Sequence, residues 1–421
     1  MKPTHLQGTL RMVYPYLCND QWNRHPGKKL YTNRWKDHWE INGINCMDDF
    51  QIFVKPVGAV CNLACSYCYY LDKQAIYQEE PGYCMHDDLL ESYILQHISA
   101  STGPDIFFAW HGGEPMLAGQ QFFERVIELQ QKHLPKNFTI VNGIQTNGTL
   151  LDAGWCRFLK ENNFIVGISL DGPEDFHSKY RGNRNGQSVF NKVLRGYRLL
   201  KDFGIPTEIL CVVHSENVHD PLGVYHFFRN LKTEFVTFIP LVEKQNSSAE
   251  AVSVRTVPSK AFGEFLCSIF VEWKESDIGA IKVQIFEEAL RSAFQLDHTL
   301  CIFKKTCGGV PVIEHNGDFY SCDHYVNEEN RLGNIRTNSL AELLESPDQK
   351  AFGQAKLDSL PQYCLSCEVR DMCNGACPKD RFILTPDGEP GLNYLCEGYK
   401  MFFNHCKPFV EQVAEVWRGD Q

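Results

Sequence analysis

The chain has 421 residues, of which 43% are hydrophobic and 22% are charged, and its formal net charge is −11. This composition is that of a soluble globular protein, and the length suits one large domain with a smaller one beside it. The negative charge and the lack of a Lys/Arg tract argue against nucleic acid as the main partner. No apolar run reaches the roughly 18 residues of a membrane span, so a membrane is not expected as a partner either.

The 18 cysteines are the most unusual part of the composition. The first residues lack the charged tip and apolar stretch of a secretory signal, so we expect a cytoplasmic protein. In a reducing compartment, cysteines act as metal ligands more often than they form disulfides. The composition therefore predicts metal sites.

Residues 1–50 carry three Trp and several basic residues without a clear period, and we interpret them as an N-terminal extension. Beyond them, short apolar segments alternate with amphipathic ones. The predicted strands are 51–57, 105–110, 139–145, 165–171, 207–213 and 235–241. The predicted helices are 86–100, 119–133, 152–162, 188–203 and 221–231. This alternation predicts an α/β fold in which parallel strands are joined by right-handed crossovers.

The character of the chain changes near residue 300. Residues 259–296 are predicted to form two further helices, and eight of the 18 cysteines then fall between 301 and 396. The pair Asn316-Gly317 predicts a hairpin turn. Because so loop-rich a segment has little apolar core of its own, we expect a small cluster-stabilised domain over 297–421 that ends in a helix.

Three cysteines, Cys61, Cys65 and Cys68, follow the first predicted strand with the spacing C-x3-C-x2-C. Three thiolates can hold three irons of a 4Fe–4S cluster and leave the fourth iron open, whereas a cluster used only for electron transfer usually has four Cys ligands. This run, with Tyr67 before the last Cys, resembles the signature of radical S-adenosylmethionine (radical SAM) enzymes. The resemblance implies S-adenosylmethionine as a cofactor, with Tyr67 among its contacts. It also implies a partial (β/α)6 TIM-like barrel over 51–296, with the chemistry at the C-terminal ends of the strands.

A second motif, Gly112-Gly113-Glu114, follows the second predicted strand. Two glycines permit close backbone approach, and exposed N–H and C=O groups can meet the two ends of a zwitterion. Alone, the pair is better explained as an ordinary turn at the end of a strand. About 45 residues after the cysteine motif, it resembles the segment that holds the methionine moiety of the cofactor.

Four further residues match cofactor contacts of the radical SAM family. Asn147 lies in a segment of small polar residues at the end of a strand, and Ser169 and Arg181 match positions that contact the ribose and carboxylate of the cofactor. Val242 matches a contact to the adenine. The alternatives remain open, because Arg181 also suits a solvated surface and Val242 also suits the barrel core.

The later cysteines resemble those of the SPASM domain, which carries two auxiliary 4Fe–4S clusters. The resemblance assigns the first auxiliary set to Cys301, Cys307, Cys322 and Cys377. It assigns the second auxiliary set to Cys364, Cys367, Cys373 and Cys396. The alternative is structural zinc, because C-x2-C pairs commonly hold zinc.

Several longer segments narrow the resemblance to anaerobic sulfatase-maturating enzymes over about residues 50–410. They are WHGGEP, QTNGTL, SLDGP, FIPLVE and the pair Cys322-Asp323. That family oxidises a Cys or Ser of a sulfatase to Cα-formylglycine, and either target type is open here. The resemblance implies three 4Fe–4S clusters, an unfolded or nascent sulfatase polypeptide as substrate, and a flavodoxin- or ferredoxin-like electron donor.

Asp323 matches the base of that family. Because a carboxylate is a weak base, we expect partial burial to raise its pKa. Tyr70 and His111 are candidates to line the peptide channel, although a core aromatic residue and a structural histidine are the alternatives. Two other functions stay open, namely another SPASM peptide-modifying enzyme, such as a thioether-forming maturase, and a zinc-stapled binding protein.

Overall fold

A computed structural model describes residues 50–77, 83–245 and 251–419, so the predicted N-terminal extension lies outside the described residues except for Phe50. One curved sheet organises the chain, with the strand order β10-β9-β8-β1-β2-β3-β4-β5-β6-β7. Strands β1 to β7 lie side by side in chain order, and each pairs in parallel with the next. They are β1 (Phe53–Val54), β2 (Asp105–Trp110), β3 (Thr139–Thr146), β4 (Ile165–Ser169), β5 (Thr207–Val213), β6 (Phe235–Pro240) and β7 (Lys282–Val283). All six predicted strands are therefore confirmed, although β1 is much shorter than predicted.

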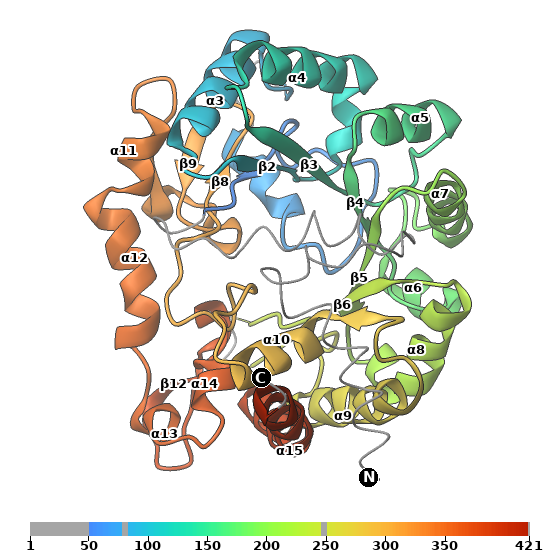
Figure 1. The fold of residues 1–421 in the computed structure, drawn as a ribbon, viewed down its shortest axis with the longest axis vertical. Helices are drawn as coiled ribbons and strands as arrows, with labels where there is room; N and C mark the ends of the chain where they lie inside the picture. The colour runs from blue at the N-terminus through green and yellow to red at the C-terminus, as the bar shows by residue number, and fades with distance from the viewer. Residues whose placement is uncertain (1–49, 78–82, 246–250, 420–421) are drawn as a thin grey trace.

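Helices cover the outer face of this sheet (Figure 1). They are α3 (Asp87–Ala100), α4 (Gln120–His133), α5 (Ala153–Glu161), α6 (Glu174–Tyr180), α7 (Phe190–Asp202) and α8 (Pro221–Asn230). Helix starts follow capping chemistry: the Asp152 side chain accepts the Trp155 N–H, and Asp220 accepts the Gly223 N–H. Helix α6 and strand β7 were not predicted, because seven and two residues are too short to show a period.

The cysteine-rich region continues the same sheet. Strand β8 (Val312–Ile313) pairs in parallel with β1, and β9 (Asp318–Tyr320) and β10 (Arg331–Asn334) follow as antiparallel neighbours. The predicted hairpin turn joins β8 to β9, where Gly317 has a φ of 95°. The division predicted between residues 296 and 297 stays a prediction, and β8 on β1 ties the two parts together.

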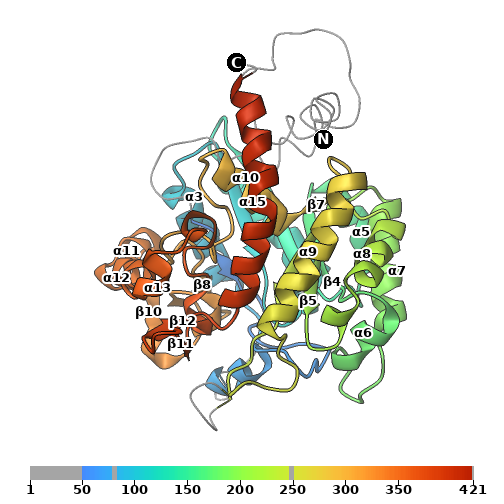
Figure 2. The ribbon, with the colours of Figure 1, turned by 90° about the horizontal axis from the view of Figure 1, so that it is seen from below.

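Three helices hold the cysteine-rich region against the barrel. α9 (Ser259–Ser276) and α10 (Gln284–Ala293) are the two helices predicted after the barrel, and α15 (Cys396–Gly419) runs alongside them (Figure 2). A Cβ at Gly263 would lie 2.8 Å from the Gly398 Cα, so α9 and α15 cross at close range. No helix in the described part of the chain is long and apolar enough to cross a membrane.

The remaining elements are short. They are α11 (Leu340–Leu344), α12 (Pro347–Asp358), α13 (Gln362–Leu365), α14 (Arg370–Cys373), β11 (Ile383–Leu384) and β12 (Pro390–Leu392). The 3₁₀ helices are η2 (Leu71–Tyr77), η3 (Pro115–Ala118), η4 (Asn217–His219), η5 (Asp323–Tyr325), η6 (Glu328–Asn330) and η7 (Pro378–Asp380). Four of them contain or directly follow a cysteine of the predicted sets, namely α13, α14, η5 and η7.

Candidate active site and auxiliary cluster sites

The loop after β1 brings the first three cysteines together. Cys65 is buried, whereas Cys61 and Cys68 are partly exposed. Burial raises the pKa of Cys61 to about 11, and the thiolates of Cys65 and Cys68 contribute to this rise. Two backbone bonds, Ala64 N–H to Gly182 O at 2.9 Å and Ser66 N–H to Tyr180 O at 2.9 Å, fix the loop. Three converging thiols fit a cluster, whose irons replace the protons.

The Gly-Gly-Glu motif packs directly on this loop. Gly113 N–H donates to Gly58 O at 2.9 Å, and Glu114 N–H donates to Val60 O at 2.9 Å. A Cβ at Gly113 would lie 2.1 Å from Val60 O, and Gly112 has a φ of 126°. Both glycines are therefore required by the close approach of two backbones. The Gly113 N–H is already bonded to Gly58 O and is not available to the cofactor. Contact of the other groups of this motif with the cofactor stays a prediction.

Glu114 links two motifs. Its buried carboxyl group accepts Thr146 Oγ1 at 2.8 Å, Met116 N–H at 3.1 Å and Asn147 N–H at 2.8 Å. Burial raises the pKa of Glu114 to about 7, against the effect of these hydrogen bonds. The Asn147 amide in turn donates to Asn62 Oδ1 at 2.9 Å and lies 3.7 Å from Cys61 Sγ. Both predicted cofactor residues thus brace the cysteine loop.

Arg181 is not a solvated surface residue, because only 9% of it is exposed. Its Nε donates to Asp171 Oδ2 at 2.8 Å, and Tyr67 OH donates to the same oxygen at 2.5 Å. Burial alone would raise the pKa of Asp171, but the Arg181 guanidinium lowers it. Among the described residues the terminal nitrogens of Arg181 make no hydrogen bond, so they suit the carboxylate that the resemblance assigns to them. Asp171 organises this group and was missed, although it lies in the SLDGP segment.

Ser169 and Val242 lie at the C-terminal ends of β4 and β6. Ser169 Oγ accepts Gln145 Nε2 at 3.2 Å, and Val242 is partly buried against the main apolar core. Ile239, at the same end of β6, is 37% exposed. Each predicted cofactor residue therefore lies at this end of the strands or on the loops that follow them, as the barrel architecture requires.

The cysteines of the second auxiliary set line one pocket. The pocket is formed by Tyr363, Cys364, Cys367, Val369, Arg370, Cys373, Gly375, Leu392, Asn393, Cys396 and Lys400. Burial, helped by the thiolates of Cys364 and Cys367, raises the pKa of Cys373 and Cys396 to about 12. Four thiols facing one pocket are the donor set of a 4Fe–4S cluster.

The first auxiliary set is also brought together. Burial raises the pKa of Cys322 and Cys377, and the Cys301 thiolate contributes to both. Cys307 likewise contributes to the raised pKa of Cys301, for which burial is again the main cause. Across the described ranges, no group of three or more His, Cys, Asp or Glu is spaced for a single metal ion. A 4Fe–4S cluster has a different requirement, because each thiolate binds its own iron.

A buried charged group lies beside the first auxiliary set. Lys55 is 0% exposed, and its Nζ lies 2.5 Å from Asp323 Oδ1 and 2.8 Å from His111 Nδ1. Tyr69 OH donates to Asp323 Oδ2, which joins the base candidate to the loop of the first three cysteines. An ammonium group only donates, so His111 Nδ1 accepts and its proton sits on Nε2. The ring of His111 stacks on Phe53, with centroids 4.9 Å apart.

Comparison with known proteins decides the family. The radical SAM superfamily model matches residues 56–228, and the SPASM iron-sulfur cluster-binding domain matches residues 301–368. The serine-type anaerobic sulfatase-maturating enzyme of Bacteroides thetaiotaomicron is 44% identical over 383 residues, covering 88% of this chain and 92% of that protein. The chain belongs to the anaerobic sulfatase-maturating enzymes.

Two further relatives agree. The cysteine-type anaerobic sulfatase-maturating enzyme of Clostridium perfringens is 34% identical over 370 residues, covering 87% of this chain and 99% of that protein. The solved structure of native anSMEcpe with bound AdoMet and Cp18Cys peptide is 33% identical, has a TM-score of 0.78, and covers 87% of this chain and 99% of that chain. The predicted family, fold class, radical SAM oxidoreductase class and sulfatase-maturating function are therefore confirmed.

The pKa expected for the base of this sulfatase-maturating enzyme is wrong in direction. Burial does raise the pKa of Asp323, but Lys55, His111 and His324 together lower it well below its ordinary value. Burial and Lys55 also lower the pKa of His111 to about 3, so this histidine stays neutral. Lys55 was missed because it lies in a predicted strand and its partner follows 268 residues later.

The two tyrosines after the cysteine loop differ in exposure. Tyr70 is 3% exposed and its OH donates to Glu314, so its place is that of a core residue. Tyr69 is 44% exposed and bonds to Asp323. A channel role for Tyr70 stays a prediction, and Tyr69 is the tyrosine that solvent reaches in this sulfatase-maturating enzyme.

Proposed function

We propose that this chain oxidises a Cys or Ser side chain of a sulfatase polypeptide to Cα-formylglycine by means of S-adenosylmethionine and three 4Fe–4S clusters. The observation that carries the proposal is the position of Asp323. It follows Cys322 of the first auxiliary set and bonds to Tyr69, which follows Cys68 of the barrel set. A carboxylate between two cysteine sets suits a target residue that loses a hydrogen atom, a proton and an electron.

The cofactors and the residues divide the work. When bound, S-adenosylmethionine and the barrel cluster supply the 5′-deoxyadenosyl radical that takes hydrogen from the target Cβ, and the auxiliary clusters supply an exit for the second electron. Cys61, Cys65 and Cys68 would hold the barrel cluster, and Arg181 would orient the cofactor carboxylate. The arrangement of thiols described above fits these groups.

Asp323 takes the proton of the target thiol or hydroxyl in this proposal. Its ion pair with Lys55 at 2.5 Å fixes the carboxylate and keeps it ionised, at the cost of basicity. The neutral His111 adds an N–H at Nε2, which no described residue uses. Asp323 is therefore always ionised and able to accept a proton, and its distance to the target group decides whether the transfer occurs.

The test is an anaerobic assay on the reconstituted full chain. Reduced protein, S-adenosylmethionine and matched C-x-P-x-R and S-x-P-x-R peptides are followed by mass spectrometry for 5′-deoxyadenosine and for formylglycine. Both target types are included because serine-type and cysteine-type relatives match. We expect 5′-deoxyadenosine together with a formylglycine peptide. Deoxyadenosine with unchanged peptides would instead favour another SPASM peptide-modifying enzyme.

The role of Asp323 has its own variant. Asp323→Asn is expected to keep deoxyadenosine formation and to lose formylglycine. Asp358→Asn, at an exposed position of the same region, is the matched control and is expected to keep both. Formylglycine at the wild-type yield from Asp323→Asn would remove Asp323 from the reaction.

The reduction step requires an electron donor. We also propose that this donor is a flavodoxin- or ferredoxin-like protein and that the setting is cytoplasmic.

A further inference from the structure

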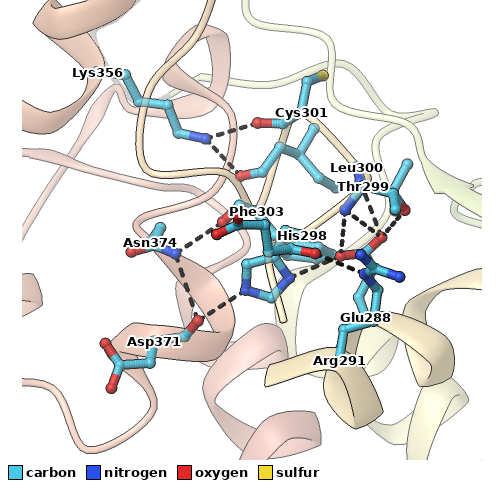
Figure 3. A network of polar contacts seen from close by, with 12 residues as sticks. Glu288, Arg291, His298, Thr299, Leu300, Cys301, Phe303, Lys356, Asp371 and Asn374 are labelled. Carbon is cyan, nitrogen blue, oxygen red and sulfur yellow. Dashed lines mark hydrogen bonds and ion pairs between the residues drawn. The ribbon is translucent and has the colours of Figure 1, made fainter. Parts of the chain in front are cut away.

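Lys356, on α12, is a buried cation without a carboxylate partner. It is 1% exposed, and within the described residues it forms no ion pair with Asp or Glu. Its Nζ donates to the backbone oxygens of Cys301 and Ile302, each at 2.9 Å (Figure 3). A buried ammonium is costly unless negative charge lies nearby, so its position calls for a counter-charge that the carboxylates do not provide.

Two cysteines of the first auxiliary set contact α12 around Lys356. The Lys356 Nζ binds the backbone oxygen of Cys301 itself. The Cys307 N–H donates at 3.0 Å to the backbone oxygen of Gly353, three residues before Lys356 on α12. The ammonium therefore lies beside the first set.

A polar network fixes the segment that receives this lysine (Figure 3). Glu288, 0% exposed, accepts Leu300 N–H at 2.9 Å and Thr299 N–H at 3.1 Å, and it contacts His298 Nδ1 at 2.7 Å. His298 Nε2 lies 2.8 Å from the backbone oxygen of Asp371. The network fixes the N–H groups of Thr299 and Leu300, directly before the two carbonyls that hold Lys356.

We propose that Lys356 raises the reduction potential of the cluster held by Cys301, Cys307, Cys322 and Cys377. This inference rests on the proposed function, which supplies that cluster. A four-thiolate cluster is anionic and gains one negative charge on reduction, so a fixed cation stabilises its reduced form more than its oxidised form. After losing a hydrogen atom and a proton, the target is a radical that must give up one electron, and this cluster would accept it. Lys356 makes that transfer more favourable.

The test measures potentials without any turnover. In the full chain, Cys61→Ala, Cys65→Ala and Cys68→Ala remove the barrel cluster and leave the auxiliary ones. Lys356→Gln removes the charge but keeps an N–H donor, and Lys356→Arg keeps the charge. Lys350→Gln is the matched control, because Lys350 lies on the same helix with a 63% exposed side chain paired to Glu345 at 2.6 Å. Iron is counted first, and the midpoint potentials are then measured by redox titration with EPR detection.

We expect Lys356→Gln to shift one auxiliary midpoint clearly to a more negative value, with a smaller shift of the other. Lys356→Arg should restore the wild-type value, and Lys350→Gln should leave it unchanged. An unmoved midpoint in Lys356→Gln with full iron overturns the inference, and so does loss of auxiliary iron, which would make Lys356 a purely structural residue. A background chain that binds no auxiliary iron counts against the proposed clusters instead, so the two failures are distinct.

Discussion

The barrel and the cysteine-rich region hold their cysteines by different means. In the barrel, the loop of Cys61, Cys65 and Cys68 is fixed by backbone bonds and by the tight approach of Gly113 to Val60. In the C-terminal region, buried charged side chains hold the backbone around the cysteines. The barrel loop is therefore held by backbone packing together with the side chains of Glu114 and Asn147, whereas buried charges hold the backbone of the auxiliary sites.

Arg381 shows most clearly how a charged side chain holds the backbone around the cysteines. Its Nε donates to Gly375 O at 2.9 Å, and its Nη2 donates to Asn374 O at 3.0 Å and to Ala376 O at 3.3 Å. Asn374, Gly375 and Ala376 have φ values of 48°, 70° and 50°, all left-handed. The turn joins Cys373 to Cys377, which belong to different auxiliary sets. One cation therefore holds an unfavourable turn between two cysteines that the resemblance assigns to different sets.

The largest expected effect is that of Gly113→Ala. The new Cβ would lie 2.1 Å from Val60 O, and backbone on both sides leaves no room for adjustment. We expect the barrel cluster to be lost and deoxyadenosine formation to fall about 100-fold, with auxiliary iron retained. Gly103→Ala, whose Cβ would meet nothing within 4 Å, is the control. Iron analysis and deoxyadenosine assay measure both, and equal rates would contradict the packing argument.

Gly375→Ala should produce the converse result. Its φ is 70°, and a Cβ would lie 2.4 Å from Leu360 Cδ2 and 2.7 Å from Arg381 Nη2. We expect loss of roughly four to eight irons, while deoxyadenosine is still formed and formylglycine is not. Gly388 has a φ of 86°, but a Cβ added there would meet no atom within 4 Å. Gly388→Ala therefore isolates backbone strain from the clash. If both variants lose the same iron, strain alone explains the result.

Glu288→Ala tests the electrostatic half of the comparison on stability. It leaves the N–H groups of Thr299 and Leu300 and the His298 ring without their buried partner. We expect the free energy of unfolding in urea to fall by about 3 kcal/mol. Glu272→Ala, which breaks a partly exposed pair with Arg229, should cost about 1 kcal/mol or less. Similar losses for both would argue against the network.

The smallest effect concerns His97 in the barrel. Burial lowers the pKa of His97 to about 3 from its ordinary 6.5. Between these values the unfolded chain binds a proton that the folded chain does not, so stability falls as pH falls. His97→Gln should remove about 2 kcal/mol of the stability change between about pH 6.5 and pH 5. Urea unfolding at both pH values measures it, and an unchanged difference would sink the prediction.

The sequence predicts what is local and fails where distant segments meet. The barrel strands follow from alternation, and the cysteine sets follow from spacing and resemblance, because both signals lie within short windows. Lys55 gives no such signal, since its burial depends on Asp323 and His111. For the same reason the lowered pKa of Asp323 and the burial of Tyr70 required the structure.

The pairing of β1 with β8 has a consequence for biosynthesis. Phe53 pairs with Val312, so the partner of β1 on this side is translated roughly 260 residues later. Until then the nascent barrel presents an open edge, with its cysteine loop just beyond it, and a parallel pair so far apart closes slowly. The order of translation therefore keeps the first iron site accessible through most of synthesis and exposes the chain to aggregation over the same interval.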